Sequence, residues 1–177
     1  MYISWIFREE KRTTKTSKTR RTYVKDIIII IIYLYMEFVN ENNSELDVVN
    51  TIRSMINHLD NSNFTEAASL LHEDVTFVRP TGNPLTKEEW VGMFSSVDVT
   101  LISNKLLEVH RVHLNGNMAM ICYTTHAKFN YKGTDNDDVS VFSAVLVRNE
   151  DLDRWEVLHV HRSTGRSPDD EMPNFGS

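Results

Sequence analysis

The chain has 177 residues, of which 41% are hydrophobic and 25% charged, a composition typical of one globular domain. This composition excludes wholesale disorder, a collagen-like repeat and a multi-span membrane protein. A single cysteine, Cys122, excludes an internal disulfide framework and a cysteine-rich zinc module. The net charge of −6 hides an asymmetry: residues 1–35 carry +5 and residues 36–177 carry −11. A domain as acidic as residues 36–177 is a poor nucleic-acid binder, because contacts with phosphate groups need a cationic surface.

The first 35 residues differ from the rest of the chain. A basic, polar stretch is followed by an apolar run over residues 27–36 that contains six consecutive isoleucines. Ten residues are about half of what a membrane-spanning helix needs, and no small-residue cleavage site of a signal peptide follows them. Residues 1–35 are therefore a leader absent from the mature domain, a targeting or anchoring segment, or a disordered extension. We expect a cytoplasmic protein, or a secreted or membrane-anchored one if this leader is genuine.

Residue spacing predicts helices first and strands afterwards. Apolar residues at helical spacing predict a long helix over residues 45–60 and two short helices over 64–71 and 87–94. The period then changes to two. The expected strands cover residues 75–78, 106–114, 118–131, 139–148 and 155–163. This order indicates an α+β domain over residues 36–166, followed by a loose tail over residues 167–177.

The strand expected over residues 118–131 has two largely apolar faces. Met118, Cys122, Thr124 and His126 lie on one face, and the other carries aromatic residues. An antiparallel sheet with one solvent-exposed face would have polar side chains on that face. We therefore expect one face to pack on the helices and the other to be covered by a second subunit, the alternative cover being residues 1–35 or the tail. The interface prediction names Tyr123, Phe129 and Tyr131.

The order of elements and the last strand resemble a known superfamily. Trp155 precedes the sequence His159-Val160-His161-Arg162-Ser163, which is similar to the final strand of the association (hub) domain of calcium/calmodulin-dependent protein kinase II. That domain belongs to the nuclear-transport-factor-2-like (SnoaL-like) superfamily. The resemblance covers residues 45–166. It implies a cone-shaped fold in which a long N-terminal helix and two short helices pack with a curved antiparallel sheet.

The resemblance also implies site residues. It places Arg162 inside the cone, where bidentate hydrogen bonds could hold a small carboxylate, with His126 and Thr124 as further ligand contacts. His159 and His161 would then point outward, toward the interface. The alternative for Arg162 is an internal salt bridge with Glu108 or Asp74.

Two functions follow from these residues. The first is a free-standing, oligomerising, non-catalytic hub-like domain with a small-ligand pocket, whose partners are copies of itself and a kinase of the same family. The second is an enzyme of the same cone, either a SnoaL-like cyclase or isomerase or a metal-free hydratase like the iota-class carbonic anhydrases. His126 is the candidate general base for that enzyme. We expect no metal or cofactor, because no third ligand accompanies the histidines of the last strand.

Overall fold

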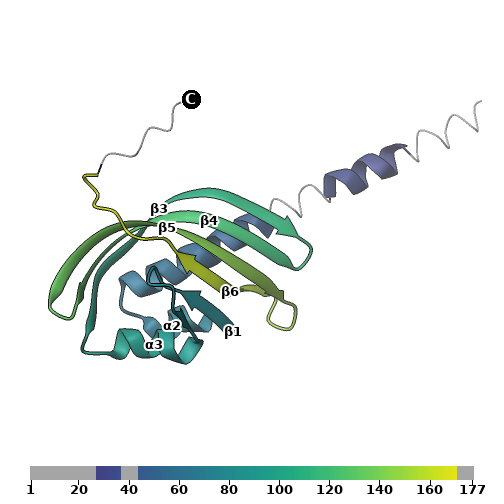
Figure 1. Ribbon diagram of the computed structural model, residues 1–177. Coiled ribbons are helices and arrows are strands. Elements are labelled where there is room, and N and C mark those ends of the chain that lie inside the picture. Colours follow the sequence, from purple (N-terminus) through teal and green to yellow (C-terminus); the bar gives the residue numbers. More distant parts are fainter. Residues whose placement is uncertain (1–26, 37–43, 171–177) are drawn as a thin grey trace, which may run out of the picture. The chain divides into compact units, whose positions relative to one another are not determined.

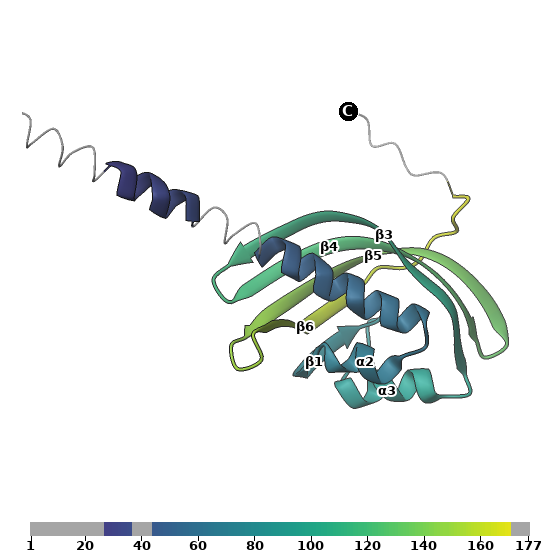
Figure 2. The same cartoon turned by 180° about the vertical axis from the view of Figure 1, so that it is seen from behind.

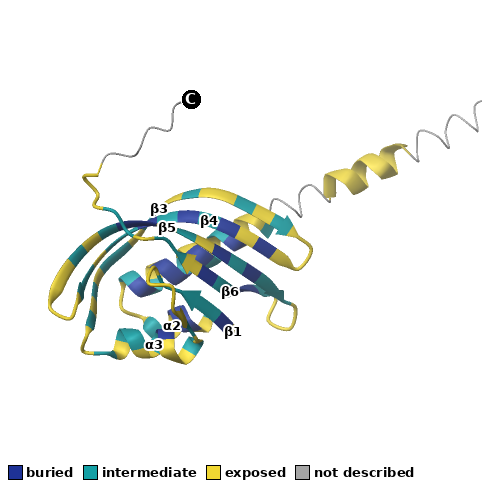
Figure 3. Ribbon diagram, in the orientation of Figure 1, coloured by how far each residue is buried: buried dark blue, intermediate teal, exposed yellow. Residues whose placement is uncertain are grey.

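The computed structural model describes residues 27–36 and 44–170. The chain divides into two units, Met1–Asn43 and Ser44–Ser177, and each is considered by itself. In the first unit, residues 27–36 form a helix whose side chains are all exposed (Figure 3).

The second unit contains helices and one six-stranded sheet (Figure 1). Its helices are residues 44–60, α2 (Phe64–Ser69) and α3 (Lys87–Ser95). Its strands are β1 (Leu71–Val78), β2 (Pro84–Leu85), β3 (Val99–Asn115), β4 (Met118–Tyr131), β5 (Thr134–Asn149) and β6 (Arg154–Arg162). The predicted α+β class is confirmed.

The sheet has the strand order β2-β1-β6-β5-β4-β3. Neighbouring strands are antiparallel except β1 and β6, which pair in parallel. The sheet is therefore mixed rather than antiparallel throughout. It curves strongly, and helix 44–60 runs along its concave side (Figure 2). The core lies between that helix and the concave face, and includes Ile52, Ile56, Ile121 and Val157.

Local sequence explains where several elements begin and end. The Thr86 side chain accepts a hydrogen bond from the Glu89 backbone N–H, and the Glu89 carboxylate accepts one from Thr86 N–H, so a capping box opens α3. Gly116, with a φ of 57°, supplies the left-handed residue of the turn between β3 and β4. Both signals can be read from the sequence. The helix predicted over residues 87–94 and the turn between the strands predicted over residues 106–114 and 118–131 lie where expected.

Two strands depart from simple alternation. β3 begins at Val99, seven residues before the predicted start at residue 106. Three irregularities interrupt its register with β4, and such irregularities break the alternation on which the prediction depended. In β6, Val145 pairs with His159 while Leu146 pairs with Val157, so Leu158 is an extra residue. Val157 and Val160 are consequently both buried, although strict alternation places them on opposite faces.

Candidate functional site

The concave side of the second unit encloses a cavity of about 230 Å³. Helix 44–60, α3 and the inner face of β3, β4 and β5 supply most of its wall. Aromatic side chains dominate the lining. They are Phe77, Trp90, Phe94, Tyr123, Phe129, Tyr131 and Phe142. Polar groups come from Arg79, Asn104, Thr125 and Arg162. Apolar walls with a few polar groups are typical of small-molecule sites.

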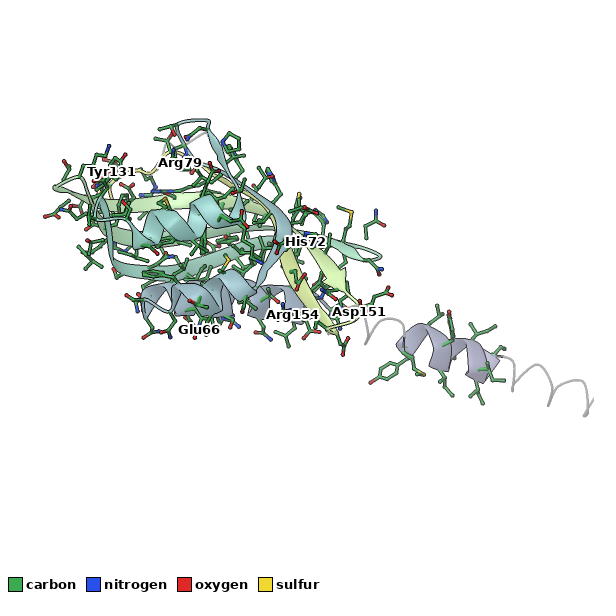
Figure 4. The ribbon with its side chains drawn as sticks, turned by 90° about the horizontal axis from the view of Figure 1, so that it is seen from below. Glu66, His72, Arg79, Tyr131, Asp151 and Arg154 are labelled. Carbon is green, nitrogen blue, oxygen red and sulfur yellow. The ribbon has the colours of Figure 1, made fainter. Side chains whose placement is uncertain are left out.

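The two ends of the sheet differ. Arg79 and Tyr131, both in the cavity lining, lie toward one end of the unit, whereas Asp151 and Arg154 lie toward the other (Figure 4). The cavity is therefore built at the end where α3 and the turn between β4 and β5 meet the sheet. Tyr131 is 44% exposed there, which places it where the cavity meets solvent.

Arg162 brings a cation into this apolar wall. Its Nη2 donates to Asp138 Oδ2 at 2.8 Å, and Nε and Nη2 each lie 3.2 Å from Ser140 Oγ. Its guanidinium carbon lies 5.5 Å from the centre of the Phe129 ring, within the range of a cation–π contact. Nη1 has no hydrogen-bond partner among the described residues. A guanidinium has five N–H donors, so donors remain for a ligand.

The internal salt bridge considered for Arg162 exists, but with a different partner. The structure pairs Arg162 with Asp138, whereas Glu108 lies beside His110 and Asp74 beside His72. The expected partners were wrong. Glu108 lies on β3, which is not a neighbour of β6, and Asp74 lies on β1 four residues before Val78, the residue that pairs with His161. Asp138 lies on β5, the other strand hydrogen-bonded to β6. Arg162 is thus held in place before any ligand arrives, which lowers the entropic cost of binding one.

Gly165 leaves room for the Asp138 carboxylate. A Cβ at position 165 would lie 2.6 Å from Asp138 Cγ and 2.8 Å from its Cβ, closer than real carbon atoms approach. We expect Gly165→Ala to displace Asp138 and to lower the free energy of unfolding by about 1 to 3 kcal/mol. Gly92→Ala, in α3 with open space around it, should instead raise it by about 0.5 to 1 kcal/mol. Urea titrations of both variants measure the difference, and equal stabilities would contradict the packing of Gly165 on Asp138.

Asn104 contributes an unsatisfied acceptor to the cavity wall. Its side-chain Oδ1 is buried and has no hydrogen-bond partner among the described residues. Its backbone N–H donates to Asp60 Oδ1 at 2.8 Å, and the Asp60 carboxylate also pairs with Lys105. These contacts anchor β3 to the end of helix 44–60. A buried acceptor without a partner is costly, so a ligand that carries a donor would gain from this position.

The hydrogen bond from Lys105, with the Asn104 N–H second, holds the pKa of the Asp60 carboxyl below its ordinary value of 3.8. A lowered folded-state pKa stabilises the fold above the unfolded pKa and loses that effect as pH falls through the folded one. Asp60→Asn should therefore be less stable than the wild type by about 0.5 to 1 kcal/mol near neutral pH. The gap should close below about pH 4. Thermal melts of both proteins from acid to neutral pH test this, and a pH-independent gap would refute the electrostatic cause.

Tyr123 forms the floor of the cavity. It is 1% exposed, and its ring stacks on Phe142 with centroids 5.2 Å apart. Burial raises the pKa of its hydroxyl well above the usual range. The hydroxyl therefore remains protonated at physiological pH and is available as a hydrogen-bond donor.

Thr124 and His126 lie outside the cavity, contrary to the expectation that they line it with Arg162. Arg162, Phe142 and Tyr123 are directly opposite one another on β6, β5 and β4, and residues so paired share one face. Thr124 and His126 alternate with Tyr123 and therefore lie on the outer face. There the Thr124 hydroxyl is 2.7 Å from His110 Nε2, and His126 pairs with Asp137.

The predicted interface residues divide between the two faces. Tyr123, Phe129 and Tyr131 line the cavity, so their assignment to an outer interface was wrong: this is the face that packs on helix 44–60. His159 and His161 do lie on the outer face, since they pair with Val145 and Ser143, and their role in association stays a prediction. That face also exposes the apolar residues Met118, Met120 and Val141.

Sequence reasoning missed several residues of the site, including Arg79, Asn104 and Asp138. Arg79 follows β1, Asn104 lies in an irregular part of β3, and Asp138 meets Arg162 only through the register of β5 with β6. Cross-strand register carries no direct signal in a single sequence, so nothing in the chain could have joined Asp138 to Arg162.

The lining residues include no aspartate, glutamate, histidine or cysteine among the part of the chain that the structure describes. Within that part, no helix has the length and apolar character needed to cross a membrane. Within residues 27–36 and 44–170, no three metal-ligating side chains gather into a group that could hold an ion.

Comparison with protein families identifies the family of this chain. The family model DUF3804, described as a protein of unknown function, matches residues 42–171. The chain belongs to the DUF3804 family. The match begins just before helix 44–60 and ends after the last described residue, so it spans the whole sheet and cavity of this DUF3804 domain. Comparison with curated proteins gives no match.

Comparison with solved structures identifies the superfamily to which this family belongs. An NTF2-like protein of unknown function from Prochlorococcus is 30% identical, with a TM-score of 0.62, and the match covers 70% of this chain and 94% of that one. The DUF3804 domain is therefore NTF2-like, as its last strand indicated.

Two more distant structures share the fold. The association domain of C. elegans calcium/calmodulin-dependent kinase II is 22% identical, with a TM-score of 0.56 and coverage of 71% of this chain and 98% of that one. A ketosteroid isomerase-like protein from Erwinia carotovora is 15% identical, with a TM-score of 0.58 and coverage of 72% and 99%. These two show the fold alone, and they represent the two functions that the sequence left open.

Proposed function

We propose that the DUF3804 domain of this chain is a non-catalytic, hub-like association domain that assembles with copies of itself and holds a small ligand in its cavity. One observation carries the proposal: the inner face of the sheet is occupied by its own helices and cavity, while the outer face exposes apolar side chains. Met118 is 50% exposed, Met120 43% and Val141 42%.

The register gathers these outer residues into one patch. Met120 pairs with Val145, Met118 with Val147, and Val141 with Thr124, so the patch runs across β4 and β5 and meets His159 on β6. Exposed apolar patches of this kind mark interaction surfaces. The same surface on a second copy has the same composition, which is what a symmetric pair of subunits requires.

The cavity supports a binding role over an enzymatic one. An isomerase or cyclase needs a proton acceptor within reach of its substrate. Asp138, the acidic residue that pairs with the lining residue Arg162, is engaged by that arginine. The candidate base His126 lies on the other side of the sheet. Three polar groups of the lining, Arg162 Nη1, the Tyr123 hydroxyl and Asn104 Oδ1, suit a small ligand with a carboxylate or another oxygen acceptor and a donor group.

Absolute mass from light scattering after size exclusion tests the assembly. We expect the full chain to run as a dimer or a closed ring, and Met120→Asp to shift it to smaller species because a charge on the patch must be desolvated. Val97→Asp introduces the same charge at a position that is fully exposed in the loop before β3, and should leave the mass unchanged. A monomeric wild type, or equal masses for the wild type and Met120→Asp, would overturn the assembly proposal.

Thermal shift with small carboxylates such as benzoate tests the cavity. Arg162→Lys keeps the charge but loses the planar fork, so stabilisation by the carboxylate should fall while the assembly persists. Arg53→Lys makes the same exchange on an exposed part of helix 44–60 and should retain the full shift. Equal shifts in the wild type and Arg162→Lys would remove Arg162 from the binding site.

A further inference from the structure

We propose that helix 27–36, together with the basic residues that precede it, binds the chain to a membrane surface that carries anionic lipids. The proposal does not depend on the function of the DUF3804 domain, because it concerns residues that belong to the other unit of the chain.

The helix is apolar on every side. Its ten residues are six isoleucines, a leucine, a methionine and two tyrosines. Their exposed fractions run from 49% at Ile28 to 68% at Tyr33, and Figure 3 shows the whole helix in the colour of exposed residues. A water-facing helix normally keeps a polar side, and one that is apolar all round needs an apolar environment.

The residue types strengthen this argument. Isoleucine is β-branched and a weaker helix former than alanine or leucine, so six in succession do not favour a helix in water. A lipid environment does favour it, because a helix satisfies its backbone hydrogen bonds within the segment and lipid offers no others.

The length of the helix fixes the mode of binding. Ten residues at ~1.5 Å each span ~15 Å, half of the ~30 Å hydrocarbon core. Asp26 and Glu37 flank the helix in the sequence, and a charge is costly in the bilayer interior. The helix therefore enters one leaflet at the boundary between headgroups and acyl chains. Tyr33 and Tyr35 suit that depth, where tyrosine is enriched.

The preceding residues select the lipid. Residues 1–26 contain eight lysines and arginines against three acidic residues, whereas residues 36–177 carry a net charge of −11. Lipid-anchored binding needs a second signal to be stable, and a polybasic stretch next to an apolar anchor supplies it. Each basic residue near an anionic surface strengthens binding about fivefold.

Flotation of the full chain with lipid vesicles tests the proposal. We expect the chain to float with vesicles of phosphatidylcholine mixed with phosphatidylglycerol, and much less with phosphatidylcholine alone. The double variant Ile29→Asp/Ile30→Asp should stay in solution. Leu46→Asp places one such charge at a residue 56% exposed on helix 44–60 and should float like the wild type. Arg20→Gln/Arg21→Gln should weaken binding to the mixed vesicles by about tenfold or more.

Three results would overturn the proposal. The isoleucine variant could float as well as the wild type, or the wild type could bind both kinds of vesicle equally. Alternatively, the wild type could sediment without lipid while the isoleucine variant does not, which would make a second copy of the helix its partner. Thermal melts control for folding: all variants should unfold at the wild-type temperature, because none of these positions belongs to the core of the second unit.

Discussion

Tyr123→Ala should lower the free energy of unfolding by about 3 to 5 kcal/mol. The side chain is 1% exposed and stacks on Phe142, so its removal leaves a void that extends the cavity and takes away an aromatic pair. Urea unfolding measures the loss, with the midpoint falling at an unchanged m-value if the variant still folds in two states.

Tyr123→Phe separates the ring from the hydroxyl. The hydroxyl makes no hydrogen bond to the described residues of the chain, so the phenylalanine variant should stay within about 1 kcal/mol of the wild type. If a ligand accepts a hydrogen bond from the hydroxyl, this variant should bind it more weakly at unchanged stability. A phenylalanine variant as unstable as Tyr123→Ala would contradict the packing described for the ring.

Ile52→Ala should cost about 2 to 5 kcal/mol. Ile52 is fully buried at the centre of the helix 44–60 stripe that packs on the sheet, and alanine leaves its space empty. Leu46→Ala on the same helix removes a side chain that is 56% exposed and should change stability by less than about 0.5 kcal/mol. Comparing the two by thermal and urea unfolding isolates burial from helix propensity. Equal losses would mean that helix 44–60 does not pack on the sheet as described.

The fold was predictable from the sequence because its signals are local. Helical spacing indicated residues 45–60, the Thr86–Glu89 capping box indicated the start of α3, and the Asn115–Gly116 turn indicated the hairpin between β3 and β4. Each of these depends on residues within a few positions of one another. The parallel pairing of β1 with β6 depends on residues about 80 positions apart, and no local pattern indicates it.

The site was harder to predict because alternation gives two faces without saying which is inside. On β4 both faces are apolar enough to be buried. The resemblance to the association domain favoured the face that carries His126 as the one that lines the cavity. The structure buries the face of Tyr123 instead. The decisive information is the register that sets Tyr123, Phe142 and Arg162 in one row, a non-local quantity. The extra residue Leu158 also changes which side chains of β6 face inward, and no feature of the sequence indicates it.

The parallel pairing of β1 with β6 has a consequence for how the chain folds during synthesis. β1 emerges early, yet one of its two neighbours is the last strand of the sheet, and its other neighbour, β2, is only two residues long. Until residues 154–162 have left the ribosome, β1 and β5 each present an open edge, and open edges invite pairing with other chains. A chain that stops before β6 therefore cannot close its sheet, so completion of the domain depends on its final strand.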